Sequence, residues 1–78
     1  MTARLLTELS APALTAALGP EHVDTLLARH NLAVVREEAG DKGGAIADLK
    51  RLVEDQRRIL GVNNNVTVTS LNYLARLL

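Results

Sequence analysis

Apolar residues recur at helical spacing in four segments of the chain, and turns containing glycine or asparagine separate these segments. The first segment covers residues 2–18. Ser10 followed by Ala11-Pro12 is typical of a helix N-cap with proline in the first turn, which predicts a break or kink near Ser10. Gly19-Pro20 then ends the helix, because glycine suits the position after a helix and proline cannot continue one.

The second segment, residues 23–39, is apolar on two sides. Such a helix is packed between neighbours rather than lying on the surface. We therefore expect Leu32 in the core, together with Leu49 and Leu52 of the next helix. Gly40 ends this segment, and Asp41 is well placed to cap the helix that follows.

The third segment, residues 42–60, has a single apolar stripe in which Gln56 is the one polar member. Its opposite face carries charged residues at i,i+4 spacing, which stabilise a helix by about 0.2–0.5 kcal/mol per pair. The pattern predicts an outer helix with one face in solvent. The three expected ion pairs are Lys50–Glu54, Arg51–Asp55 and Glu54–Arg58.

A turn sequence occurs twice at a fixed spacing of 42 residues, first as Leu18-Gly19 and again as Leu60-Gly61. Between residues 18–33 and 60–75, five of sixteen positions are identical. A fixed period in this range is typical of repeat proteins, in which each unit buries its apolar face against its neighbours. The repeat therefore indicates a scaffold or a binding surface.

The fourth segment, residues 65–78, is ambiguous when considered alone. Val66-Thr67-Val68-Thr69 is β-branched throughout and is typical of a strand. The 42-residue register, however, aligns this stretch with the second helix. We therefore predict a helix over residues 65–78 and an all-α fold of about four helices.

The 78 residues are enough for one small domain, and their nine basic and nine acidic residues cancel. Zero net charge argues against a nucleic-acid-binding surface. No apolar run approaches the roughly 18 residues of a membrane helix, and we expect no signal peptide at the N-terminus. We expect a cytoplasmic protein without a membrane or nucleic-acid partner. Tyr73 is the only aromatic residue, so leucine, valine, isoleucine and alanine must form the core.

A set of spaced residues from Leu18 to Gly61 resembles one known repeat family. The set is Leu18-Gly19-Pro20-Glu21-His22, Asp24-Thr25-Leu26, Arg29, Asn31-Leu32-Ala33, Ala39-Gly40-Asp41, Ala45 and Arg57-Arg58-Ile59-Leu60-Gly61. The chain is similar to tetratricopeptide repeats of the 42-residue kind found in kinesin light chains and in bacterial scaffold proteins. The resemblance implies antiparallel helix pairs, A and B, that stack into an α-solenoid. Residues 22–60 would form one complete repeat, residues 61–78 part of a second, and residues 2–18 a flanking helix.

In that family the A helices line a groove that binds peptides or partner proteins. The resemblance implies that His30, Asn31, Asn72 and Arg76 face this groove in the present chain. Arginine can bind a carboxylate through two hydrogen bonds, and an amide can bond to a peptide backbone. The competing interpretation is structural: Asn31 would join two helices and Arg76 would be solvated.

The last helix has no following helix B to cover it. We therefore expect an apolar surface on it, which a second copy of the chain would cover in a two-fold dimer. The residues expected in this self-association surface are Leu71, Leu74, Leu77 and Leu78.

The sequence contains no pattern that indicates an enzyme, a cofactor or a metal site. His22 and His30 are eight residues apart, no cysteine is present, and no serine has a nucleophile's context. The function expected is protein–protein interaction of the tetratricopeptide type, through a peptide or partner protein. Two alternatives remain: a small helical DNA-binding regulator, and a purely structural oligomerisation domain.

Overall fold

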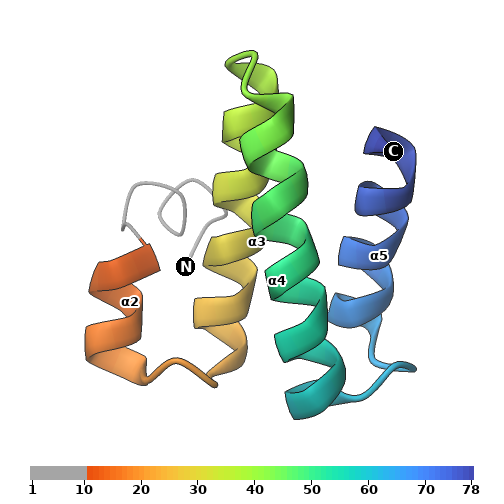
Figure 1. Ribbon diagram of the computed structural model, residues 1–78. Coiled ribbons are helices and arrows are strands. Elements are labelled where there is room, and N and C mark those ends of the chain that lie inside the picture. The colour runs from red at the N-terminus through yellow and green to blue at the C-terminus, as the bar shows by residue number, and fades with distance from the viewer. Residues whose placement is uncertain (1–10) are drawn as a thin grey trace.

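The computed structural model describes residues 11–78, which form four α-helices (Figure 1). The helices are α2 (Ala11–Leu18), α3 (Val23–Glu38), α4 (Lys42–Leu60) and α5 (Asn65–Leu77). The described chain contains no strand, so the all-α prediction is confirmed, including the helix over Val66–Thr69. The part of the first predicted helix that precedes Ala11, with Ser10, lies outside the described residues.

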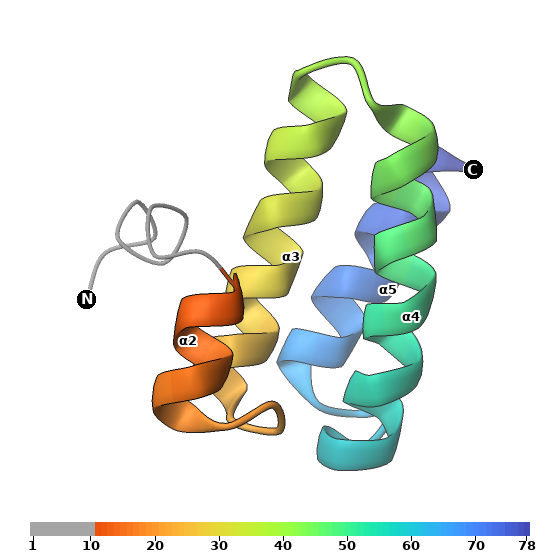
Figure 2. The same ribbon diagram turned by 60° about the vertical axis from the view of Figure 1, so that its left-hand side comes forward.

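Successive helices run in opposite directions, and each packs on the one before it: α3 on α2, α4 on α3, and α5 on α4. α3 and α4 form the central antiparallel pair (Figures 1 and 2). This helix-turn-helix packing agrees with the fold expected from the sequence. α2 has only 8 residues against the 16 of α3, so at 1.5 Å per residue it is long enough to cover about half of α3.

Polar side chains cap the first turns of three helices. His22 precedes α3, and its Nδ1 accepts a hydrogen bond from the Asp24 amide at 3.0 Å. Asp41 caps α4 by accepting from the Gly44 amide at 2.9 Å. A Cβ at Gly44 would lie 2.2 Å from an Asp41 carboxylate oxygen, so glycine is what allows this cap to close.

The two turns of the 42-residue repeat have the same backbone conformation. Gly19 has φ +92° and Gly61 has φ +89°, values that residues other than glycine rarely adopt. Thr25 lies six residues after Gly19 and Thr67 six residues after Gly61, and both threonines are fully buried. Thr25 Oγ1 donates to the Gly19 carbonyl at 2.8 Å, whereas Thr67 Oγ1 donates to the Gln56 carbonyl at 3.4 Å. The sequence repeat is therefore also a structural repeat.

The hydrophobic core lies mainly between α3 and α4, and α5 closes one side of it. Leu49 and Leu52 belong to the core, as predicted, whereas the prediction for Leu32 is wrong, because its side chain is 40% exposed. Leu32 lies towards the C-terminal half of α3, beyond the length that the short helix α2 can cover. The buried cluster consists of Leu26, Ala33, Ala45, Leu49, Leu52 and Leu77.

The exposed face of α4 carries ion pairs, but with a spacing different from the predicted one. Within α4 they join residues three apart, as in Arg51–Asp48 at 2.6 Å. Asp48 and Asp55 also bind Arg36 and Arg29 of α3. The predicted i,i+4 pairs do not form among the described residues: Asp55 binds Arg29 of α3 instead, and Glu54 lies 3.9 Å from Arg57 of its own helix.

Candidate functional site

Tyr73 is the centre of a polar cluster between α3 and α5. The His30 ring meets the Tyr73 ring edge-on, with centroids 5.6 Å apart and an interplanar angle of 63°. The Arg76 guanidinium carbon lies 5.9 Å from the Tyr73 ring centroid, within range of a cation–π interaction. The Tyr73 hydroxyl donates to Glu37 Oε2 at 3.5 Å. Burial and the neighbouring Glu37 carboxylate raise the pKa of Tyr73, so its phenol stays protonated and able to donate.

His30 also connects this cluster to Ser70, near the middle of α5. Its Nδ1 shares a hydrogen bond of 2.9 Å with the hydroxyl of Ser70, which is fully buried. Burial lowers the pKa of His30 below the ordinary value of 6.5. The imidazole is therefore mainly neutral at pH 7, and its orientation is set by both Ser70 and Tyr73.

A small cavity of about 130 Å³ lies between α3 and α5 beside His30. Its lining is nearly all apolar surface, although Asn65 and His30 supply polar edges. Among the residues around it, Asn65 and Thr69 are exposed to solvent. The six residues around it are Leu27, His30, Asn65, Val66, Thr69 and Ser70.

The structure brings together two of the four residues expected in the groove. His30 and Arg76 both contact Tyr73. Asn31 is half-buried on α3, and its side-chain amide makes no hydrogen bond with another described residue, so the expected bond between helices is not formed there. Asn72 is exposed and lies outside these contacts. The site is thus a cluster of His30, Glu37, Tyr73 and Arg76 beside an apolar cavity.

Sequence reasoning did not assign Tyr73 and Ser70 to the site. One feature of the sequence could have indicated a role for Tyr73 in the site: it is the only aromatic residue of the chain. The indication for Ser70 was weaker: this residue lies 42 residues after Ala28, and both residues are buried.

A second exposed feature is an apolar stripe on the outer side of α5. Val68 is 40% exposed and Leu78 is 75% exposed, and Ala75 is also exposed while Leu71 is half-buried. This stripe differs from the predicted self-association surface. Leu77 is buried in the core and Leu74 packs against it, so of the four predicted leucines only Leu71 and Leu78 contribute to the stripe.

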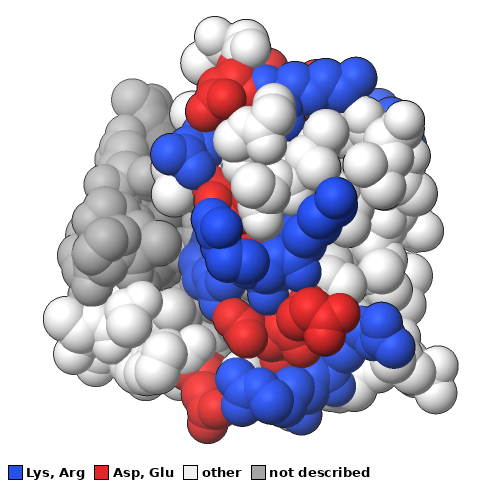
Figure 3. Space-filling view, viewed as in Figure 1, with Lys and Arg blue, Asp and Glu red and all other residues white. Residues whose placement is uncertain are grey.

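The repeat explains why this stripe is uncovered. Val68 and Ala75 occupy the positions of Leu26 and Ala33 in α3, which are fully buried in the core that α3 shares with α4. No described helix occupies the corresponding place beside α5. In Figure 3 the right-hand side of the molecule, where α5 lies in Figure 1, is largely free of charged side chains.

Comparison with protein-family models, with curated proteins and with solved structures gives no match for this chain. Among the described residues, no group of three or more histidine, aspartate or glutamate side chains could hold a metal ion. None of the helices in residues 11–78 is long and apolar enough to cross a membrane. The site must therefore be interpreted from its own geometry.

Proposed function

We propose that the chain is a tetratricopeptide-like protein–protein interaction module that binds a peptide segment of a partner between α3 and α5. The observation that carries this proposal is the apolar cavity between α3 and α5, together with the Tyr73–Arg76 pair further along α5. The 42-residue structural repeat supports the resemblance to that family.

The spacing of these features suits an extended peptide. Ser70 lines the cavity, and Arg76 follows six residues later, which is about 9 Å along a helix. Three residues of an extended peptide span about 10 Å. A peptide with one apolar side chain in the cavity would therefore place a carbonyl or carboxylate oxygen beside Arg76, where a guanidinium binds it best.

The proposal is tested by selecting binding peptides from a random library and measuring their affinity for variants. Thr69→Lys places a charge at the exposed rim of the cavity and should weaken binding about tenfold or more, because a cation beside an apolar side chain is unfavourable. Asn63→Lys adds the same charge in an exposed turn and is the matched control. Equal affinities for the two variants, or selected peptides whose NMR shifts map elsewhere, would contradict the proposal.

A second candidate function, homo-oligomerisation, is favoured by the apolar stripe on α5. Exposed apolar patches on small proteins mark interaction sites more often than chance. Because the stripe carries no charge, two copies can pair through it around a two-fold axis without repulsion. Sedimentation should then show a dimer that the double substitution Val68→Glu and Leu78→Glu dissociates.

Val62→Glu is the matched control for this second candidate. Val62 is 50% exposed but lies in the turn before α5, so its substitution should leave the dimer intact. The Leu74 position is unsuitable for such a test, because Leu74 packs against the core and a glutamate there would unfold the chain. A monomer at high protein concentration would rule out oligomerisation but would leave the peptide-binding proposal open.

A further inference from the structure

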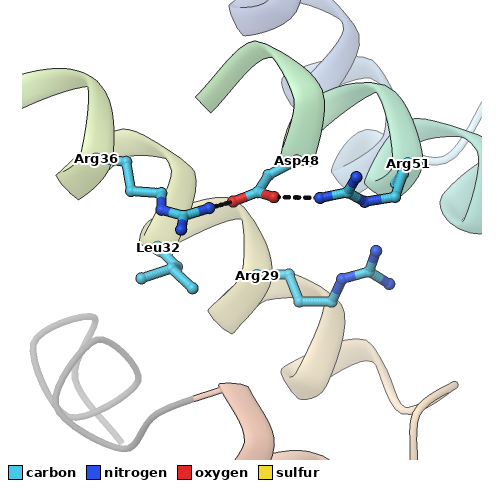
Figure 4. A pocket seen from close by; sticks show the side chains of 5 residues that line it. All are labelled: Arg29, Leu32, Arg36, Asp48 and Arg51. Carbon is cyan, nitrogen blue, oxygen red and sulfur yellow. Dashed lines mark hydrogen bonds and ion pairs between the residues drawn. The ribbon is translucent and has the colours of Figure 1, made fainter. Parts of the chain in front are cut away.

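A pocket of about 300 Å³ lies where α3 and α4 face each other on the charged side of the molecule. Its lining is formed by Arg29, Leu32 and Arg36 of α3 together with Asp48 and Arg51 of α4 (Figure 4). Figure 3 shows lysine and arginine side chains gathered in the middle of this face. The five residues are distinct from those of the cavity beside His30, so the pocket is a separate candidate site.

Two aspartates hold the three guanidinium groups in place. Asp48 accepts from Arg36 on one carboxylate oxygen and from Arg51, at 2.6 Å, on the other. Arg29 donates to Asp55 at 2.8 Å. Figure 4 shows Arg36 and Arg51 reaching Asp48 from opposite sides, with Arg29 below them. Three arginines from two helices are thus oriented around one pocket before any ligand binds.

Most hydrogen-bond donors of these arginines remain available. A guanidinium has five N–H donors, and the hydrogen bonds to the described residues use one nitrogen of each. The three arginines and the two aspartates that bind them, Asp48 and Asp55, together carry a formal charge of +1. Arg29 and Arg36 are also partly shielded, with 29% and 44% of their side chains exposed, which strengthens their interaction with an anion.

We propose that this pocket binds a phosphomonoester dianion. A phosphomonoester has three acceptor oxygens and a charge of about −1.5 to −2 at pH 7, and its three oxygens match the three guanidinium groups of the pocket. Guanidinium groups bind such oxygens through paired hydrogen bonds. A carboxylate has one charge and two oxygens, so it would leave one arginine unused. Leu32, 40% exposed in the same pocket, provides an apolar contact for the carbon group that carries the phosphate.

The test is a titration of the whole chain, followed by NMR, with inorganic phosphate, phenyl phosphate and benzoate at constant ionic strength. Phenyl phosphate should saturate and shift the Arg29, Arg36 and Arg51 side-chain signals. Benzoate should bind about tenfold more weakly, because it lacks the third oxygen and the second charge. Phosphate and phenyl phosphate distinguish the source: equal affinities indicate free phosphate, and tighter phenyl phosphate binding indicates an organic phosphomonoester. Failure of both to saturate below about 20 mM would overturn the proposal.

Two variants distinguish phosphate binding in this pocket from a general attraction of anions to a positively charged surface. Arg51→Gln and Arg57→Gln each remove one charge from an exposed position of α4, but Arg57 does not line the pocket. Arg51→Gln should weaken phenyl phosphate binding about tenfold and Arg57→Gln less than twofold. Equal weakening by both would refute the site. Because Leu32 is exposed, Leu32→Ala should fold normally and remove any preference for phenyl phosphate over inorganic phosphate.

Discussion

His22 and Asn64 lie 42 residues apart and cap their helices in the same way. Their backbone angles are φ −69°, ψ 141° and φ −70°, ψ 138°. Each side chain accepts a hydrogen bond from the amide two residues later, at 3.0 Å for His22 and 2.9 Å for Asn64. Two chemically different residues thus satisfy the equivalent free amide at the starts of α3 and α5.

This equivalence predicts that the two caps are interchangeable. His22→Asn should change the free energy of unfolding by less than about 0.5 kcal/mol, because asparagine offers its oxygen in the same place and is a favourable N-cap residue. His22→Ala and Asn64→Ala should each lower it by about 1 kcal/mol. Urea denaturation followed by circular dichroism measures all three. A large loss with His22→Asn would show that the imidazole has a role beyond the cap.

Leu49 and Leu32 should respond very differently to truncation. Leu49 is fully buried between α3 and α4, so Leu49→Ala should lower the free energy of unfolding by about 2–5 kcal/mol. Leu32→Ala should cost less than about 1 kcal/mol, because its side chain is already partly in water. The pair is measured by thermal or urea denaturation. Similar losses for the two variants would place Leu32 in the core after all.

Gln56 should be replaceable with a gain in stability. Its side chain is fully buried, and neither its amide nitrogen nor its oxygen has a hydrogen-bond partner among the described residues. Burying such a group without a partner costs about 1–3 kcal/mol. Gln56→Met keeps the length of the side chain and should raise the free energy of unfolding by about 1 kcal/mol or more. A loss instead would indicate that the amide is satisfied by bound water.

The buried imidazole of His30 should make stability depend on pH. Because burial lowers the pKa of His30 in the folded chain below 6.5, the unfolded chain binds a proton more readily. Stability should be full above about pH 6.5 and should fall as the pH drops through the lower, folded-state pKa. Urea midpoints between pH 5 and 8 measure this, best in the His22→Asn background, where His30 is the only histidine. His30→Gln should flatten the profile, and an unchanged slope would assign it to other groups.

The positions of the helices could be predicted from the sequence because their ends depend on local interactions. α4 has the predicted bounds, and α3 and α5 each end one residue earlier than predicted. Capping side chains, first-turn prolines and positive-φ glycines act within a few residues, so they can be recognised without knowing the fold. The 42-residue repeat was also visible in the sequence. Its register correctly predicted a helix over Val66–Thr69 despite the strand-like composition of these residues.

Only the tertiary structure decided which side of each helix has a neighbour. Leu32 and Leu77 are both leucines on apolar helix faces, yet Leu32 is 40% exposed and Leu77 is buried. The difference depends on the length of α2 and on how α5 meets the core, which no local pattern encodes. Asp48 likewise bonds to Arg51 within its own helix and to Arg36 of α3. The pocket of three arginines exists because two helices place their charges side by side, and periodicity along one helix cannot reveal that arrangement.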